Sequence, residues 1–413
     1  MDSQAGIKLV LSAYVCRPDA GSEPGTGWGW AIHLARAGCQ VYLLTAGRNQ
    51  KAIEGYLQKF PCPELHPYFI NVPGMDPTTT GTVHYILWQY FALRLARRLQ
   101  ATVHFDLAHH VSYGTVVIPT PLTRLGLPTI FGPVGGGQIA PTSLLSYFGK
   151  KRKVEWLRSQ FMHLLPKIWL YRSLVQKLSM VFVANSETKA LLRNAGCKHV
   201  ELLCDTGVHL NHCSDRQRTF VSAPKIHLLW VGQFAPRKGL ELALDALALT
   251  NPNVHLTIMG EGLTAEDMAT KIAERNLVGR VSWKGSRAPW SEVLDAYSSH
   301  DALLFSSLRD SFGSQNLEAM CAALPIISLN LSGARDFVCP DAGIKVDIGD
   351  SAQETVRRLA TAIDSFAALS TEARSQMSAA ALRCAQSFLW TKRAALMHER
   401  YRQVLSGDVD YAA

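Results

Sequence analysis

The sequence predicts an α/β protein built from two doubly wound domains. Short apolar runs rich in Val, Ile and Leu alternate with stretches of helix length, first in the amino-terminal half and again in the carboxy-terminal half. Continuous apolar runs of this kind are typical of strands buried on both faces of a parallel sheet. The chain has 413 residues, 47% of them hydrophobic, which is enough for two domains that each bury a core.

The predicted strands follow the same pattern in both halves. In the first half they are KLVLSAY (8–14), VYLLT (41–45), DLAHHV (106–111), PTIFG (128–132) and MVFVANS (180–186). In the second half they are IHLLWVG (226–232), VHLTIMG (254–260), VSWKG (281–285), ALLFSS (302–307) and PIISLN (325–330). Helix-length stretches such as 27–37 and 83–101 separate several of them, so right-handed crossovers would give two Rossmann-like parallel sheets.

A polar segment, DTGVHLNHCSDRQRTFVSAP (205–224), separates the two arrays. We therefore expect an amino-terminal domain over 1–205 and a carboxy-terminal domain over 206–389. Ligands of such sheets bind at the carboxyl ends of the strands, and two facing domains would place them in a cleft. An amphipathic helix over about 390–406 fits either domain on its pattern alone.

Charge and cysteine usage limit the cellular setting. The net charge is +9, but residues 1–200 carry 21 basic and 9 acidic side chains, which predicts an anionic partner for the first half. The nine cysteines include no C-x-x-C pair, so we expect free thiols rather than a disulfide framework or a zinc site. No apolar run reaches membrane-spanning length and the first residues lack signal-peptide features, which predicts an intracellular protein.

Two glycine-rich segments follow predicted strands of the first half. GSEPGTGWGW (21–30) supplies Gly25, Thr26 and Gly27, and FGPVGGGQ (131–138) supplies Gly135 and Gly136. Both are candidate phosphate or acceptor loops, because glycines let the backbone approach an anion. A nicotinamide site would need an acidic residue after the second strand, and TAGRNQ there has none. A tight turn and a flexible hinge remain as the structural alternatives.

The strongest candidates lie in the second half. VGQFAPRKG places Arg237 and Lys238 in a loop between a strand and a helix, where two cations could bind a diphosphate. The alternative is a solvated basic loop, which is more common for an Arg-Lys pair. ALLFSSLRDSFGSQNLEAMCAALPIISLN (302–330) places Asp310 before a strand-to-helix turn and Glu318 one turn into the next helix. Two carboxylates so placed could hold two regions of a sugar nucleotide.

This last segment resembles the Glu-x7-Glu region of retaining glycosyltransferases with the GT-B fold, in particular family 4 (glycosyl transferases group 1). Other segments carry the resemblance along nearly the whole chain: VGQFAPRKG, TIMGEG (257–262), DTGVH (205–209), SGARDFV (332–338) and the final FLWTKRAALMHERYRQVL. The resemblance implies two Rossmann-like domains facing across a cleft, with about 390–413 returning to the first domain. It also implies a nucleotide-diphosphate sugar as co-substrate, with no cofactor and no obligatory metal.

The resemblance assigns roles to the donor-side residues. Glu318 would hold the ribose hydroxyls, Asp310 would contact the transferred sugar, and Lys238 with Arg237 would bind the diphosphate. Asp310 stands where the family usually has Glu, and the strand-end position usually held by Arg is Gln233. The remaining expected donor contacts come from loop and turn residues: Gly232, Gly260, Gly262, Phe312, Gly313, Ser314 and Gln315.

FDLAHHV (105–111) resembles the family segment that carries a first-domain histidine. It offers His109 and His110, which strand alternation points to opposite faces, so only one can line a cleft. A satisfied structural histidine is the alternative to a catalytic one, and we favour His110 for the site.

The segment 150–177 joins many Lys and Arg residues to Trp156, Trp169 and other apolar side chains. A basic amphipathic helix with interfacial aromatics suits an anionic membrane surface. A helix packed on the sheet with a solvated basic face is the alternative. No nucleic-acid-binding module is visible.

We therefore expect a retaining glycosyltransferase that acts on a lipid-linked or polysaccharide precursor as a peripheral protein at the cytoplasmic face of the membrane. One alternative is a sugar-nucleotide epimerase or hydrolase on the same fold, which would turn over the donor without an acceptor. Another is a non-catalytic membrane-docking subunit, which would turn over no donor.

Overall fold

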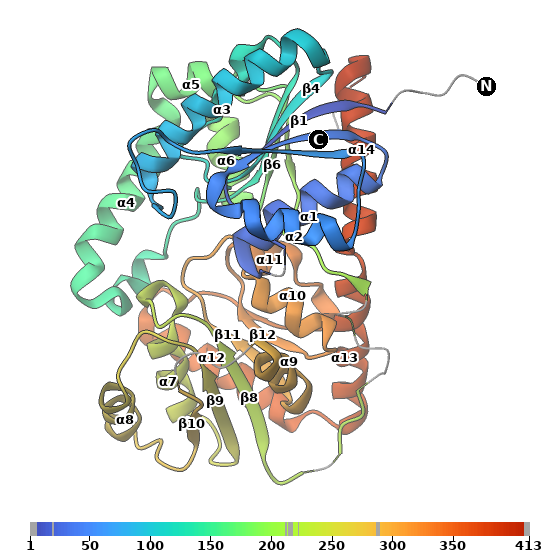
Figure 1. The fold of residues 1–413 in the computed structure, drawn as a ribbon. Helices are drawn as coiled ribbons and strands as arrows, with labels where there is room; N and C mark the ends of the chain where they lie inside the picture. Colours follow the sequence, from blue (N-terminus) through green and yellow to red (C-terminus); the bar gives the residue numbers. More distant parts are fainter. Residues whose placement is uncertain are drawn as a thin grey trace. The chain divides into compact units, whose positions relative to one another are not determined.

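The computed structural model describes residues 6–18, 20–210, 213, 218–221, 223–285 and 290–408. The chain forms two compact units, each built around one parallel sheet (Figure 1). Unit 1 comprises Met1–Gly137, His163–Gly207 and Phe388–Ala413, and unit 2 comprises Gln138–Met162 and Val208–Ser387. Among the described residues, no helix combines the length and the apolar character needed to cross a bilayer.

The sheet of unit 1 has seven parallel strands in the order β3-β2-β1-β4-β5-β6-β7. The strands are β1 (Lys8–Ala13), β2 (Gln40–Ala46), β3 (Leu65–Ile70), β4 (Leu107–Ser112), β5 (Thr129–Val134), β6 (Met180–Val183) and β7 (Val200–Leu202). The helices are α1 (Ser22–Arg36), α2 (Gln50–Lys59), α3 (Thr82–Val103), α5 (Trp169–Val175), α6 (Ser186–Asn194) and α14 (Trp390–Ser406). Short 3-10 turns are η1 (Gly47–Asn49), η2 (Pro121–Leu125) and η4 (Leu165–Lys167).

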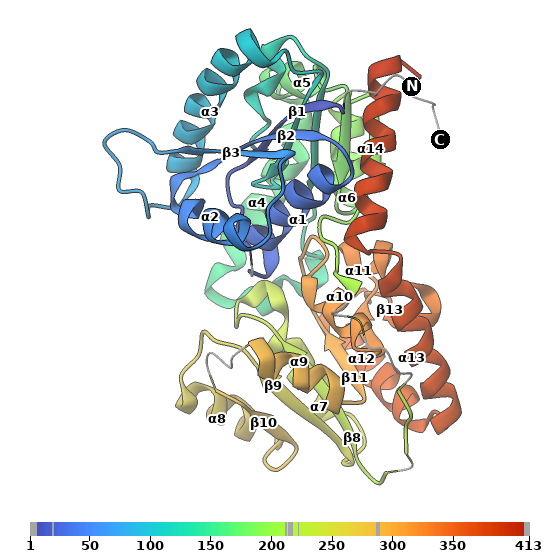
Figure 2. The same ribbon diagram turned by 45° about the vertical axis from the view of Figure 1, so that its right-hand side comes forward.

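Strand alternation divides the core of unit 1 into two clusters. Leu9 and Leu11 of β1 pack in the cluster shared with α1 and α14, whereas Val10 packs in the cluster shared with α3. The two helices α3 and α14 therefore lie on opposite faces of the sheet (Figure 2). The five strands predicted in this half are present. The prediction missed β3, which contains Pro67, and β7, which has three residues.

The sheet of unit 2 has six parallel strands in the order β10-β9-β8-β11-β12-β13. The strands are β8 (Ile226–Val231), β9 (Val254–Met259), β10 (Val281–Trp283), β11 (Ala302–Phe305), β12 (Ile326–Leu329) and β13 (Gly343–Val346). The helices are α4 (Arg152–Leu164), α7 (Leu240–Ala248), α8 (Ala265–Glu274), α9 (Trp290–Ser299), α10 (Ser314–Cys321), α11 (Ser332–Phe337), α12 (Ala352–Ala368) and α13 (Thr371–Gln386). Short 3-10 turns are η3 (Thr142–Lys151), η6 (Pro236–Lys238) and η7 (Pro340–Ala342). Of these strands, only β13 was not predicted.

The segment 138–162 lies in unit 2, which differs from its predicted place in the amino-terminal domain. Leu144 and Phe148 of η3 belong to the hydrophobic core of unit 2. The Tyr147 hydroxyl donates a hydrogen bond to Asp245 of α7 at 2.7 Å. The sequence gives no sign of this exchange, because the segment is short and joins predicted elements of the first half.

The carboxy-terminal helix α14 lies in unit 1, as the family resemblance implied. Its first residue, Trp390, packs on α1 at Gly29, where an added Cβ would lie 2.1 Å from the indole ring. The Trp390 and Trp30 rings meet edge to face with centroids 5.3 Å apart. Near the other end of α14, the buried Tyr401 hydroxyl is 2.6 Å from His109 Nδ1 on β4. α14 is therefore part of the core of unit 1.

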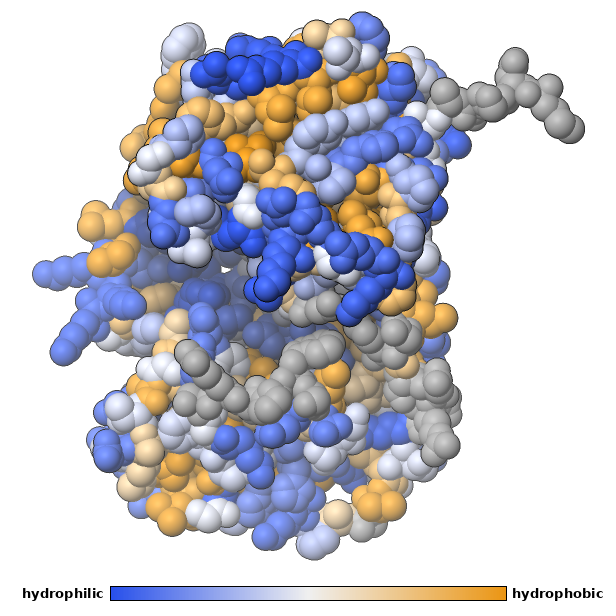
Figure 3. Space-filling model, in the orientation of Figure 1, coloured by the Kyte–Doolittle hydropathy of each residue, from blue (hydrophilic) through white to orange (hydrophobic). Residues whose placement is uncertain are grey.

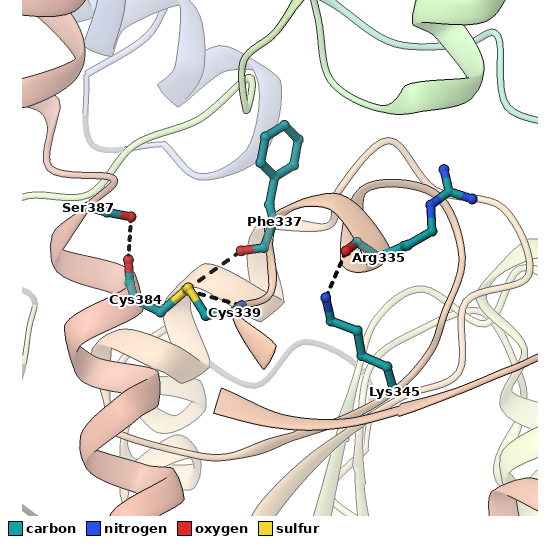
Figure 4. The surroundings of a disulfide bond; sticks show 6 residues. All are labelled: Arg335, Phe337, Cys339, Lys345, Cys384 and Ser387. Carbon is teal, nitrogen blue, oxygen red and sulfur yellow. Dashed lines mark hydrogen bonds between the residues drawn. A yellow bond between two sulfur atoms is a disulfide. The ribbon is translucent and has the colours of Figure 1, made fainter. Parts of the chain in front are cut away.

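The expectation that all nine cysteines are free is wrong for one pair. Cys339, beside η7, and Cys384 of α13 form a disulfide, while the other seven cysteines are free (Figure 4). Their Cα atoms are 6.0 Å apart although 45 residues separate them in sequence. The pairing depends on the packing of α13 against η7, so cysteine spacing gives no indication of it.

Two helical glycines offer a matched test of the α1–α14 packing. We expect Gly29→Ala to lower the free energy of unfolding by about 1–3 kcal/mol, because the new methyl group overpacks the contact with Trp390. Gly55→Ala in α2 has open space and should instead stabilise by about 0.5–1 kcal/mol. Urea unfolding of both variants measures the difference, and a stabilising Gly29→Ala would contradict the described packing.

Candidate functional site

In unit 2 the order of the strands reverses between β8 and β11, which are neighbours in the sheet. The loops that follow these strands diverge at such a point and leave a crevice at the carboxyl edge. Here the two loops are tied together: the Arg237 carbonyl accepts a hydrogen bond from Leu308 N at 2.8 Å. Below them, the Trp230 indole donates to the Ser306 hydroxyl at 3.1 Å. The crevice therefore has a fixed floor.

Three charged side chains meet in this crevice, and the sequence analysis named all three of them. Lys238 is 8% exposed and donates a hydrogen bond from Nζ to the Asp310 carboxylate. The same carboxylate oxygen lies 3.7 Å from Arg237 Nη1. Gly239 has φ +69° and allows the turn after Lys238. A Cβ added to Gly239 would lie 2.1 Å from the Ser306 carbonyl oxygen. Two cations thus share one carboxylate.

Glu318 lies in α10, facing the same charge cluster. Its Oε2 accepts a hydrogen bond from the Tyr297 hydroxyl at 2.9 Å, and Ser314 also hydrogen-bonds to it. Burial raises the pKa of Glu318, while these hydrogen bonds and the nearby charge of Lys238 offset part of that rise. The structure therefore brings Glu318 close enough to Lys238 for their charges to interact. Tyr297 is a partner that the sequence analysis did not identify.

The turn before α10 contains the other predicted donor contacts. Gly313 has φ +85° and precedes the helix without a side-chain cap, so the first N–H groups of Ser314 and Gln315 start the helix at the crevice. Phe312 is buried, which leaves only its backbone for a ligand. The Gln315 Oε1 atom is buried without a hydrogen-bond partner.

The turns after β8 and β9 run side by side. Phe234 N donates to the Glu261 carbonyl at 2.7 Å, and Gly232 N donates to the Met259 carbonyl at 3.0 Å. Gly260 and Gly262 permit this approach, since a Cβ on Gly260 would lie 1.8 Å from the Gly232 carbonyl oxygen. Gln233, the residue at the usual place of Arg, is exposed.

Aromatic side chains support these turns from one side. The Phe234 ring lies between those of Trp230 and Trp283, with centroid distances of 5.7 and 5.9 Å. The Trp283 indole donates to the Gly260 carbonyl at 3.2 Å. This wall gives the turns a flat apolar neighbour beside the charged cluster.

In unit 1, His109 and His110 point to opposite faces of β4, as predicted. His109 contacts Tyr401 of α14, and its Nε2 is 2.6 Å from the Gly132 carbonyl. His110 Nε2 is 3.0 Å from the Tyr85 hydroxyl on α3. Both rings are fully buried, and burial lowers the pKa of His109 to about 4 and that of His110 to about 3. Both are therefore neutral at physiological pH.

The prediction of a glycine-rich loop at 21–30 is wrong in its local structure. Gly25, Thr26 and Gly27 lie inside α1, which begins at Ser22. A Cβ on Gly27 would lie 2.2 Å from the Val15 carbonyl oxygen, so this glycine allows α1 to pack on the backbone after β1.

The second glycine-rich segment is held by its neighbours. Gly135 N donates to the Gly114 carbonyl at 2.9 Å, so this N–H group is already bonded within unit 1. Gly136 adopts φ +100° in the turn that follows. The N–H group of Gly135 is therefore not available to an anion in this structure.

Glu23 is a titratable residue that the sequence analysis did not single out, although it lies in the first glycine-rich segment, 21–30. Its Oε1 accepts a hydrogen bond from Gly114 N at 2.6 Å, which joins the start of α1 to the loop after β4. Burial raises the pKa of Glu23 to about 7, with Asp205 adding to the rise and the Gly114 hydrogen bond opposing it. An acidic residue at the start of the first helix was the signal that could have indicated it.

Comparison with known proteins identifies the part of the chain that contains the charged crevice. Residues 214–383 match the family described as glycosyl transferases group 1. This part of the chain is a group 1 glycosyltransferase domain. Asp310, Lys238 and Glu318 all lie within it.

Two curated relatives match parts of the chain. The lipopolysaccharide 1,6-galactosyltransferase of Salmonella typhimurium is 34% identical over 116 residues, which are 27% of this chain and 32% of that protein. The D-inositol 3-phosphate glycosyltransferase of Thermobispora bispora is 27% identical over 245 residues, 54% of this chain and 56% of that protein. The matches thus span from about a third to just over half of the relatives' length.

Solved structures match along nearly the whole chain. Sucrose-phosphate synthase from Thermosynechococcus elongatus has a TM-score of 0.66 at 17% identity, over 97% of this chain and 100% of that chain. HepE of Anabaena, in complex with UDP and glucose, has a TM-score of 0.58 at 16% identity with the same coverage. At these identities the likeness shows the fold, which is two Rossmann-like domains of the GT-B type, as predicted.

The raised pKa of Glu23 predicts a pH-dependent stability. Because the folded state holds this proton up to about pH 7 and the unfolded chain releases it near pH 4.5, stability falls between these values, by about 3 kcal/mol at most. Glu23→Gln keeps the acceptor oxygen without the charge, so its stability relative to the wild type should increase as pH rises from about 5 to 8. The free energy of unfolding of both proteins, measured from about pH 5 to 8, tests this prediction. Glu54→Gln, at an exposed position, is the control. A difference independent of pH would contradict the assignment.

Proposed function

We propose that the protein is a retaining glycosyltransferase of family 4, which moves a sugar from a nucleotide-diphosphate sugar to an acceptor hydroxyl. The observation that carries the proposal is the meeting of Lys238, Arg237 and Asp310 at the strand-order reversal of unit 2. The group 1 domain match supports a sugar-nucleotide donor, and HepE, which shares the fold, is described in complex with UDP and glucose.

The charges of the crevice suit a diphosphate. Lys238 and Arg237 carry two positive charges against the single negative charge of Asp310, so the cluster has a surplus that an anion would neutralise. A donor diphosphate would take over the contacts that Asp310 now makes. Stabilising the charge that develops on a departing group is commonly the largest catalytic effect, and Lys238 is the residue to supply it.

The two acids would then divide the donor between them. Asp310, released from the cations, would accept hydrogen bonds from the transferred sugar, and Glu318 from the ribose. Ser314 and Gln315 would offer backbone N–H groups at the start of α10. The turns at Gly260 and Gly262, beside the aromatic wall, would receive the base.

The reaction needs no metal in this proposal, and none of the residues named acts as a nucleophile. The bond between the sugar anomeric carbon and the diphosphate oxygen breaks while a bond to the acceptor oxygen forms on the same face. The proton of the acceptor hydroxyl passes to the departing phosphate, which leaves the α-configuration of the donor unchanged.

The helix α4 supports a membrane-borne acceptor. Two of its three buried residues, Glu155 and Ser159, are polar, and Glu155 pairs with Arg309 at 2.7 Å. Its exposed face carries Val154, Leu157 and Phe161 at helical spacing. This reverses the usual arrangement, in which the apolar face is buried. The alternative, a helix packed on the sheet with a solvated basic face, does not account for these exposed apolar side chains.

Basic residues precede this apolar face. Exposed side chains of the adjoining segment are Lys150, Lys151, Arg152 and Lys153. Figure 3 shows hydrophobic atoms next to hydrophilic ones at the left edge, where Figure 1 places α4. An anionic bilayer would accept both features, so we propose peripheral binding at the cytoplasmic face, with a lipid-linked or polysaccharide precursor as acceptor.

The donor assignment predicts the effect of removing one cation. We expect Lys238→Gln to lower kcat/KM by about a hundredfold or more, because the diphosphate loses a buried charge. Lys225→Gln, an exposed lysine just before β8 at the opposite edge of the sheet, is the matched control. The assay measures release of nucleoside diphosphate from UDP-, GDP-, ADP- and dTDP-linked sugars with a lipid extract as acceptor. Equal activity in both variants would contradict the site, and equal turnover without acceptor would favour a hydrolase.

The membrane assignment has a separate test. Sedimentation with vesicles containing anionic lipid should fall by about tenfold in Phe161→Asp, because a phenyl ring no longer enters the bilayer. Val278→Asp changes a valine elsewhere on unit 2 that is 76% exposed, against 41% for Phe161, and should leave sedimentation unchanged. Wild-type protein that stays in the supernatant at low salt would contradict membrane binding.

A further inference from the structure

Unit 1 has a reversal of strand order like that of unit 2, and a crevice is expected at this position. The strand order of its sheet reverses between β1 and β4, and the loops after these strands face each other at the carboxyl edge. Glu23 ties the start of α1 to the loop after β4 through Gly114 N. The side chains around this crevice are aromatic or polar: Tyr14, Arg48, His84, Tyr85 and Tyr113.

Arg48 has a fixed position in the turn after β2. Asn49 donates hydrogen bonds to the Tyr14 carbonyl and to the Thr45 hydroxyl, at 3.1 and 2.7 Å. Gly47 lies so close to Asn71 that a Cβ would be 1.9 Å from its side-chain oxygen. The guanidinium carbon of Arg48 stands 4.3 Å above the centre of the Tyr14 ring. These contacts hold the cation over an aromatic face.

The guanidinium of Arg48 is only partly satisfied. Its Nη1 donates to the Thr79 carbonyl at 3.3 Å, but its Nη2 is buried and has no hydrogen-bond partner. Within the described part of the chain, no carboxylate forms an ion pair with it. A buried donor of a charged group without a partner is costly, so this N–H group is a candidate for contact with an anionic ligand.

The neighbours of Arg48 do not compete for this role. Burial and the charge of Arg48 both lower the pKa of His84, so the imidazole is neutral. The His84 Nδ1 is 2.7 Å from the Tyr14 hydroxyl, which fixes the Tyr14 ring beneath the cation. Arg48 is therefore charged while its neighbour His84 is not, and its Nη2 has a donor to offer.

Tyr113 supplies a partly exposed ring in the same crevice. Its centroid is 5.4 Å from that of Tyr14 and 5.2 Å from that of Tyr85. The charges of both Glu23 and Arg48 act on its hydroxyl, so it lies within reach of the anionic and the cationic side chain. A ring so placed can support the apolar face of a sugar, with hydroxyl groups directed to Glu23.

We propose that the crevice formed by Arg48, Tyr113 and Glu23 binds the acceptor, and that the part of the acceptor bound there is a phosphorylated sugar. Arg48 Nη2 binds the phosphate, Tyr113 packs on the sugar ring, and Glu23 accepts a hydrogen bond from a hydroxyl. The assignment of the ligand as an acceptor rests on the proposed function, whereas the binding of a phosphate at Arg48 does not.

The test measures binding to the full chain rather than activity. Because the cations of the donor crevice also attract phosphate, all proteins carry Lys238→Gln. We expect inorganic phosphate and glucose 6-phosphate to bind about tenfold more weakly after Arg48→Gln, as loss of a charge-assisted contact implies, in titrations followed by ³¹P NMR. Arg94→Gln, an exposed arginine on α3, is the matched control. Equal affinity in the two variants, or no phosphate binding before Arg48 is changed, overturns the proposal.

A second variant separates the sugar contact from the anion contact and also covers failure of Arg48→Gln to fold. Tyr113→Ala should weaken binding of glucose 6-phosphate and leave inorganic phosphate unchanged. Octyl phosphate serves as a probe for a lipid phosphate. Stronger binding of octyl phosphate than of glucose 6-phosphate overturns the sugar-phosphate class. If the protein turns over no donor in the earlier assay but still binds phosphate in a manner that depends on Arg48, the proposed glycosyltransferase function is wrong and this site stands.

Discussion

The reversal of strand order within each parallel sheet is the constraint on which the rest of the structure depends. In unit 2, crossovers run outward from β8 on one side and from β11 on the other, so the loops after these neighbours diverge and leave a crevice. The Lys238–Asp310 ion pair, with Arg237 beside it, joins the two loops across that crevice. In unit 1 the hydrogen bond from Gly114 N to Glu23 occupies the corresponding position. Each unit thus places a carboxylate where its two halves separate.

These contacts are better explained by ligand binding than by stability. A buried ion pair contributes little net free energy after its desolvation, and two cations on one carboxylate leave a surplus charge. Burial keeps the proton on Glu23 to about pH 7, which costs stability at higher pH. Arg48 holds a buried donor without a partner. Features that cost free energy in the isolated fold are expected where a ligand completes them.

The sequence was informative wherever a local pattern decides the structure. Apolar runs predicted β1, β4, β8 and β11, the strands beside the two reversals, whereas Gly343 and Lys345 interrupt the apolar residues of β13. The spacing of Asp310 and Glu318 located the charged site because both lie on one strand-turn-helix unit. Tertiary contacts were not accessible in this way. The Cys339–Cys384 pair, Tyr297 at Glu318 and Arg48 over Tyr14 join elements that are distant in sequence.

The central claim is that the crevice of unit 2 holds a nucleoside diphosphate. A thermal-shift titration with UDP, GDP, ADP, dTDP and CMP, with and without EDTA, tests it most directly. A ligand at 100 times its Kd stabilises by about 2.7 kcal/mol, which such a measurement detects. The account predicts a shift with one diphosphate that is insensitive to EDTA and lost in Glu318→Ala. No shift with any nucleotide, or an equal shift in the variant, would contradict it.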